Sequence, residues 1–304
     1  MSTSFRVAGP IVMFLTAAAV FACSGAAGES GFGESGAKSS GGNGSSGGNG
    51  ASSGSPGTFG DSDGSAPTGT CAPSAQNAEI ADNGCDDDAD GTVDNVPTCD
   101  SGLAIDGDGA SFAKAIGLCD DVGSKGFGVV SVTYTNGFGR TAAPHAGQWG
   151  LLPKFGSVLK PREGQTLAAL SSGYAREFDS QNGGSTPFYE PRALDGESFP
   201  TGAAPNGFPK AAAGCQQDNL VNDMIDVKLV IKAPPNAQGF KFDFDFHSSE
   251  WPAFVCTNFN DAFVAYLSAQ GFNNGAPDNV SFDSKNNPVS VNNGFFDAGR
   301  CAIR

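Results

Sequence analysis

The chain has 304 residues and a formal net charge of −15, from 32 acidic and 17 basic side chains. That charge repels a phosphate backbone, so we expect no nucleic-acid partner, and no glycine-rich loop joins a strand to a helix, so we expect no nucleotide either. With 24 Phe, 44 Gly and only 3 Met, the composition favours strands and turns over helices.

Residues 1–22 are predicted to be an export signal. Arg6 supplies the positive charge, and residues 7–21 form an apolar run that is short for a membrane span. The sequence Val-Phe-Ala-Cys at 20–23 resembles the lipobox of bacterial lipoproteins, whose cysteine receives the lipid. This resemblance implies an exported outer-membrane or cell-surface lipoprotein held on a lipid membrane through Cys23. The alternative is ordinary secretion, with Cys23 a chance cysteine near the cleavage site.

Residues 23–70 consist mostly of Gly, Ser, Ala and Asn. They lack the apolar side chains that would offset the entropy of ordering, so we expect a disordered, flexible linker. Two segments of it, 44–48 and 50–54, match the G-x-S-x-G pattern of nucleophilic serines. Neither lies between a strand and a helix, so both matches follow from composition alone.

Residues 71–100 form a small module rich in Cys and Asp, with a predicted calcium loop at its centre. Asp86, Asp88, Asp90 and Asp94 are spaced so that their carboxylates converge on one point, and the Thr92 carbonyl supplies a further oxygen. Such an oxygen set suits a hard cation, so we expect a structural Ca²⁺ ion there. The alternative is a solvated acidic turn between two disulfides.

The loop departs from an EF-hand, because position twelve falls on Pro97 and the flanking sequence is not helical. Residues 83–94 instead resemble the Asp-rich repeats of thrombospondin type 3. They also resemble a metal-binding motif of secreted myxobacterial proteins, in which a Cys often stands where this chain has Ala89.

Residues 101–304 are predicted to form one β domain with a single short helix. Strands are expected over 126–135 and around the alternating positions 227, 229 and 231, with a further apolar segment at 167–176 that ends in a turn. No regular structure is assigned to 177–213. The helix rests on the apolar spacing of Phe112, Ala115, Ile116 and Cys119, with Asp108 or Ser111 as its N-cap.

Residues 239–268 carry the clearest strand pattern of this domain. Phe at 240, 242, 244 and 246 alternates with charged residues, which predicts a strand with an aromatic face. A bend at 248–252 leads to a second apolar strand that begins at Asp261. Two such strands require an opposing apolar sheet, so the expected fold class is all-β, a β-sandwich or jelly-roll-like domain.

Four segments resemble the choice-of-anchor L family of exported bacterial proteins: 113–119, 170–173, 244–252 and 260–263. The most specific are the sequences FDFHSSEWP at 244–252 and NDAF at 260–263. The resemblance covers about 101–296 and implies a β-rich extracellular module of unknown biochemical role. Similar proteins continue past 293–297 to a final strand, so the domain is expected to be truncated at its C-terminus. Apart from Cys23 there are seven cysteines, which leaves one thiol unpaired in an oxidising compartment.

His247, Ser248 and Glu250 are close in sequence, but adjacent residues of a strand point apart, so no catalytic triad is expected. Glu250, Asn260 and Asp261 allow two interpretations: a second metal site, or a turn whose backbone donors they satisfy.

The function expected from these features is that of a non-catalytic, lipid-anchored surface protein with a calcium-stabilised β-sandwich. It would act in adhesion or recognition of a carbohydrate or protein ligand. The alternative is a secreted hydrolase-like enzyme whose site is built from loops.

Overall fold

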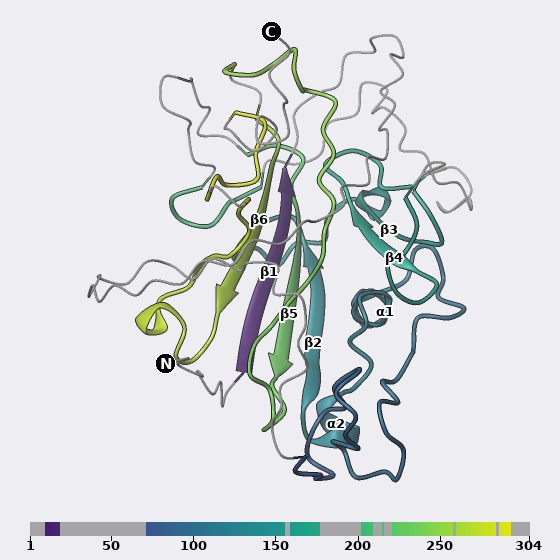
Figure 1. Cartoon of the computed structure of the whole chain (residues 1–304). Coiled ribbons are helices and arrows are strands. Elements are labelled where there is room, and N and C mark those ends of the chain that lie inside the picture. Colours follow the sequence, from purple (N-terminus) through teal and green to yellow (C-terminus); the bar gives the residue numbers. More distant parts are fainter. Residues whose placement is uncertain are drawn as a thin grey trace, which may run out of the picture.

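The structure, a computed structural model, describes residues 10–18, 71–155, 159–176, 202–208, 215, 221–257, 260–283 and 286–292 (Figure 1). Its elements are mostly strands with two short helices, as expected for an all-β fold. In chain order they are β1 (Pro10–Ala18), α1 (Gly109–Ala115), α2 (Val122–Lys125), β2 (Gly128–Thr135), β3 (Trp149–Leu152), β4 (Leu167–Leu170), β5 (Ile225–Lys232), β6 (Ala262–Ser268) and β7 (Asp278–Asn279), with 3-10 turns at Ala146–Gln148 and Asn273–Gly275.

The strands form two antiparallel sheets. The larger has the order β2-β5-β1-β6-β7, and the smaller pairs β3 with β4. β5 lies inside the larger sheet, and its residues Val227, Leu229 and Ile231 are all buried. The prediction of an apolar strand at these positions is therefore confirmed.

The core lies between the larger sheet and a second layer made by α1 and the β3–β4 sheet (Figure 1). Within the described residues, the layer opposite the five-stranded sheet is thus a helix with a two-stranded sheet, rather than a second large sheet. The buried members of this core are Phe112, Ala115, Leu151, Val227, Leu229, Ile231 and Ala265.

Helix α1 begins as the sequence predicts. Asp108 is the N-cap, and its carboxylate accepts a 2.9 Å hydrogen bond from the backbone N–H of Ser111, which lowers the pKa of Asp108. The helix lies so close to β2 that a Cβ on Gly109 would be 2.5 Å from the carbonyl oxygen of Val132. Ile116 closes the helix as its C-cap and is 42% exposed, so it does not extend the buried face.

Residues 239–248, the aromatic stretch, are not hydrogen-bonded into a β-sheet. The prediction of a strand here is therefore wrong. The predicted alternation is nevertheless present, because the four Phe side chains are half-buried while the charged residues between them are exposed. Phe244 stacks on Phe263 of β6 at 4.6 Å between ring centroids, and Phe240 and Phe242 pack against the core. The stretch therefore buries its rings by lying against the core instead of extending a sheet.

The N-terminal apolar run contributes a strand. Residues 10–18 form β1, which pairs antiparallel with β5 on one side and with β6 on the other (Figure 1). The export role of residues 1–22 stays a prediction. In the part of the chain that the structure describes, no helix is long and apolar enough to cross a membrane.

Three disulfides join Cys71 to Cys85, Cys99 to Cys119 and Cys215 to Cys256. The remaining two cysteines, Cys23 and Cys301, lie outside the described residues. The predicted linker at 23–70, most of 177–213 and the chain after 292 also lie outside them.

Candidate metal-binding site

The acidic loop that begins at Asp86 is shaped by hydrogen bonds from its own backbone to its carboxylates. Asp86 accepts from the N–H groups of Asp90 and Gly91, both at 3.0 Å, and Asp90 accepts from the N–H of Thr92 at 2.8 Å. Gly91 has a φ of 93°, a left-handed conformation that side chains disfavour. A glycine thus stands at a left-handed position in the middle of the loop.

Glu79 holds this loop from outside the predicted motif. Its carboxylate accepts hydrogen bonds from the backbone N–H groups of Asp87 at 2.9 Å, Asp88 at 3.3 Å and Asp94 at 2.7 Å. Sequence reasoning missed this residue because Glu79 precedes the motif and has no place in its Asp spacing.

Glu79, Asp86 and Asp88 bring one carboxylate oxygen each to within 4.8 Å of the other two. All three side chains are half-buried. Three negative groups this close repel one another, and a bound cation would relieve the repulsion. Carboxylate oxygens are the ligands that hard divalent cations prefer. The structure therefore contains an acidic group whose chemistry fits a metal ion, and it includes two of the five predicted ligands.

The other predicted ligands have different contacts. Asp94 accepts from the backbone N–H groups of Asn83 and Gly84, at 3.0 and 3.1 Å. The second oxygen of Asp90 accepts from the amide of Asn95 at 2.8 Å, and this hydrogen bond lowers the pKa of Asp90. Thr92 is exposed and donates its N–H to Asp90. These contacts hold the loop in shape around the converging group.

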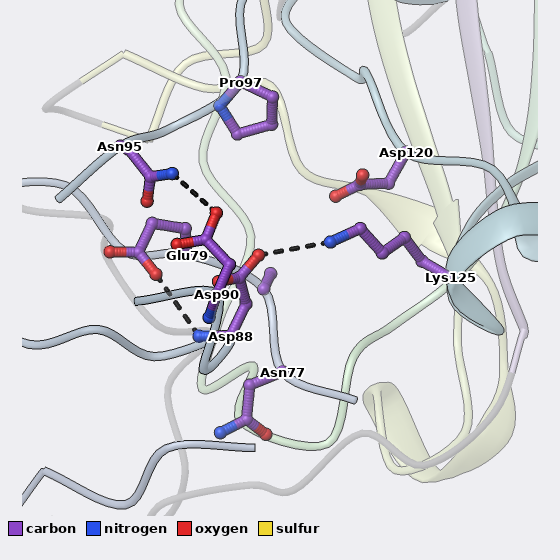
Figure 2. A pocket seen from close by; sticks show the side chains of 9 residues that line it. Asn77, Glu79, Asp88, Asp90, Asn95, Pro97, Asp120 and Lys125 are labelled. Atoms are coloured by element: carbon purple, nitrogen blue, oxygen red, sulfur yellow. Dashed lines mark hydrogen bonds and ion pairs between the residues drawn. The ribbon is translucent and has the colours of Figure 1, made fainter. Parts of the chain in front are cut away.

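A lysine of the β domain contacts the group formed by Glu79, Asp86 and Asp88. Nζ of Lys125, at the end of α2, lies 3.2 Å from the Asp88 carboxylate, and this contact raises the pKa of Lys125 (Figure 2). The two side chains line a cavity of about 140 Å³ together with Glu79, Asp90 and Asp120. A positive charge from the protein thus already stands beside one of the candidate ligands.

The Cys- and Asp-rich module of residues 71–100, which contains the acidic loop, is joined to the β domain by two further contacts. The side-chain amide of Asn236 exchanges hydrogen bonds with the backbone of Ala78, at 3.0 and 2.8 Å. The Asp100 carboxylate accepts from the backbone N–H groups of Gln165 and Thr166, and the first of these bonds lowers the pKa of Asp100. These contacts link the folding of the module to the folding of the β domain.

Glu250 and Asp261 are in contact just before β6, whereas the side-chain oxygen of Asn260 contacts Ser290 and Asn292. Glu250 accepts a 3.1 Å hydrogen bond from the N–H of Asp261, whose carboxylate accepts from the hydroxyl of Ser248. Asn260 accepts from the N–H of Asn292 at 3.0 Å. These hydrogen bonds fix the backbone just before β6. A second metal ion at Glu250, Asn260 and Asp261 stays a prediction.

Glu250 is only 4% exposed, and burial, followed by the charge of Asp261, raises its pKa to about 8. One oxygen of Glu250 has no hydrogen-bond partner among the described residues. The neutral, protonated form of this carboxyl is therefore favoured near neutral pH.

His247, Ser248 and Trp149 each have contacts within the protein. The ring of His247 stacks on Phe155 at 5.8 Å, whereas Ser248 donates to Asp261, so these two side chains have different partners. The Trp149 indole stacks on Tyr134 at 4.6 Å and donates a 2.9 Å hydrogen bond to the Gly107 carbonyl. Trp149 thus packs within the protein on both its ring face and its N–H.

No family model, curated protein or solved structure matches the chain. The resemblance to the choice-of-anchor L family therefore stays a prediction.

Proposed function

We propose that this chain is an exported, non-catalytic surface protein, anchored by a lipid on Cys23, whose β domain is stabilised by Ca²⁺ and serves in adhesion or recognition. The observation that carries the proposal is the convergence of Glu79, Asp86 and Asp88 within 4.8 Å of one another. The β-sandwich architecture expected from the sequence remains part of this proposal.

Calcium is the preferred ion because every candidate ligand is a hard oxygen. Zinc sites in proteins are built mainly from Cys and His, and here Cys85, the cysteine nearest the acidic run, is already joined to Cys71. The ion would act on stability because Asp88 of the loop contacts Lys125, and the module that contains the loop contacts the β domain through Ala78 and Asn236. An ion bound only to the native state raises the free energy of unfolding.

Export is supported by the three disulfides, since disulfides persist in oxidising compartments outside the cytosol. Lipid attachment rests on the lipobox-like sequence before Cys23, and an acyl chain adds about 0.8 kcal/mol of membrane affinity for each buried methylene. An intact-mass measurement of membrane-extracted protein tests this part. The proposal expects a chain that begins at Cys23 and carries acyl groups, and an unmodified Cys23 contradicts it.

The alternative of a secreted hydrolase is favoured by one observation, the Glu250–Asp261 pair with its raised Glu250 pKa, because perturbed carboxyl pairs are common at catalytic sites. The burial of Glu250 favours a structural role for that pair over contact with a substrate.

Isothermal titration calorimetry tests the metal site. Titration of the chelator-treated protein with Ca²⁺ should show one site with a Kd of roughly 10⁻⁴–10⁻³ M, the range of extracellular modules. Asp86→Asn should weaken binding at least tenfold, while the matched change Asp245→Asn, at an exposed acid of the aromatic stretch, should leave the Kd unchanged. Equal binding by both variants, or no heat with the unmodified protein, contradicts a site at this loop.

A further inference from the structure

The larger sheet depends on its middle strand. Residues 10–17 of β1 lie opposite residues 232–225 of β5, and residues 12–18 lie opposite residues 268–262 of β6. Both pairings are antiparallel, so β5 and β6 run parallel to each other and do not pair directly.

Removing β1 would leave a gap that the flanking strands cannot close by themselves. Neighbouring strands lie about 4.8 Å apart, so β5 and β6 are separated by roughly twice that distance. The N–H and C=O groups along both facing edges would then lose their partners, and unpaired backbone groups in a protein interior are costly. The outer edges of β5 and β6 are already paired, with β2 and β7.

The two strands that border this gap contribute residues to the apolar core. Leu229 of β5 and Ala265 of β6 are buried members of the same apolar cluster, and their register partners on β1 are Met13 and Leu15. The sequence of β1, PIVMFLTAA, carries no charged residue. An empty gap would therefore open the apolar core to water.

We propose that the facing edges of β5 and β6 form a strand-acceptor site. Its ligand class is an extended, uncharged, apolar peptide segment, about the length of β1, that runs antiparallel to both strands. Pro10–Ala18 fills the site in the full chain. When the chain is processed to begin at Cys23, as in the proposed function, a strand of a second polypeptide fills it by β-augmentation. The site itself does not depend on bound calcium.

A cleavable full-length chain tests the site. A site-specific protease sequence is placed within residues 23–70, the purified protein is cut there, and the two pieces are separated by size exclusion with chelator present. We expect the N-terminal piece to elute with the remainder, and a fluorescent PIVMFLTAA peptide to exchange into the complex. A peptide of the same length with charged residues at alternate positions should not exchange. The N-terminal piece could instead be released, and the remainder could then lose β-structure. Recovery of that β-structure on addition of the peptide also supports the site.

Two outcomes overturn the proposal. One is a released N-terminal piece and a remainder that keeps its circular dichroism and its melting temperature, because the sheet then needs no middle strand. The other is a remainder that unfolds and is not restored by the peptide. In the intact chain, Leu15→Pro removes a backbone donor from β1. It should lower the melting temperature by several degrees or more, whereas Gly47→Pro in the linker segment should leave it unchanged.

A cysteine pair tests the register without relying on folding of a fragment. Thr16 and Val264 are register partners, and both side chains are close to Cys in size. The double variant Thr16→Cys with Val264→Cys should form a disulfide at least tenfold faster than Ala17→Cys with Val264→Cys, because Ala17 lies opposite Phe263 and is out of register with Val264. Peptide mapping identifies the bond. Equal rates in the two variants, or no bond in either, contradict the observed pairing.

Discussion

The Glu79 carboxylate accepts a 2.7 Å hydrogen bond from the backbone N–H of Asp94, at the far end of the acidic loop. The same carboxylate accepts from the N–H groups of Asp87 and Asp88 near the start of the loop. One side chain outside the motif thus joins both ends of the loop and also belongs to the group of converging carboxylates.

Glu79→Ala should destabilise the protein even when no metal is present. The variant leaves three backbone donors without their acceptor, and hydrogen bonds to charged groups contribute about 1.5–3 kcal/mol each. Because the loop is partly exposed and water replaces some of these bonds, we expect the free energy of unfolding in urea with chelator to fall by about 2–3 kcal/mol. Glu163→Gln, at an exposed acid, is the control and should change it little. A Glu79→Ala value equal to that control would refute the role of Glu79 in holding the loop.

Lys125→Met should tighten calcium binding. The lysine ammonium lies 3.2 Å from Asp88 and repels an incoming cation, while its side chain is 40% exposed. An exposed ion pair contributes about 0–1 kcal/mol to stability, so the variant should stay folded. Calorimetry should give a Kd several-fold lower than that of the control Lys160→Met. An unchanged or higher Kd would mean that Lys125 supports the site instead of competing with the ion.

The stability of the protein should fall as pH rises across the neutral range. The pKa of Glu250 is raised from its ordinary value of 4.5 to about 8, chiefly by burial, and burial likewise raises the pKa of Asp226 from 3.8 to about 7. Between the ordinary and the raised pKa the native state binds more protons than the unfolded state. The free energy of unfolding therefore decreases with pH in that window.

Each unit of pKa difference corresponds to about 1.4 kcal/mol, so the two carboxyls together should lower the free energy of unfolding by up to about 7 kcal/mol between about pH 5 and about pH 8. Urea unfolding at several pH values from about 5 to about 8, with chelator present, measures it. Glu250→Gln should flatten the part of the slope that lies nearest pH 8, and Asp226→Asn the part below pH 7. A flat profile in the unmodified protein would show that both carboxyls are ionised throughout.

Gly109→Ala should destabilise the contact between α1 and β2. The added Cβ would lie 2.5 Å from the Val132 carbonyl oxygen, so helix and strand must move apart. Overpacking of this kind costs about 1–3 kcal/mol, which should appear as a melting temperature lower by several degrees. Gly239→Ala is the matched control, because its Cβ would meet nothing within 4 Å. Equal melting temperatures for the two variants would contradict the close packing of α1 on β2.

Local sequence patterns predicted the elements whose signal lies within a few adjacent residues. The Asp108 cap with the spacing of Phe112 and Ala115 located α1, and runs of apolar and β-branched residues located β2, β5 and β6. The four-residue elements α2 and β3 were missed because so short a segment carries too little periodicity.

What depends on distant partners could not be predicted in this way. Alternation at 239–248 shows which side chains are buried, but not whether the backbone has a strand beside it. An apolar run such as 10–18 has the same composition in an export signal and in a central strand. Glu79 was missed because the fold, and not its sequence spacing, brings it to Asp86 and Asp88.

The melting temperature of the protein with millimolar Ca²⁺ and with chelator tests the central claim most directly. At about 10 mM Ca²⁺, which is roughly ten to a hundred times the expected Kd, native-state binding adds about 1.4–2.7 kcal/mol of stability, or roughly 3–10 °C for a domain of this size. We predict a cooperative melt that rises by this amount with Ca²⁺ and loses the rise in Asp86→Asn and Asp88→Asn. A melt that is indifferent to Ca²⁺, or an equal rise in both variants, would contradict a calcium-stabilised domain.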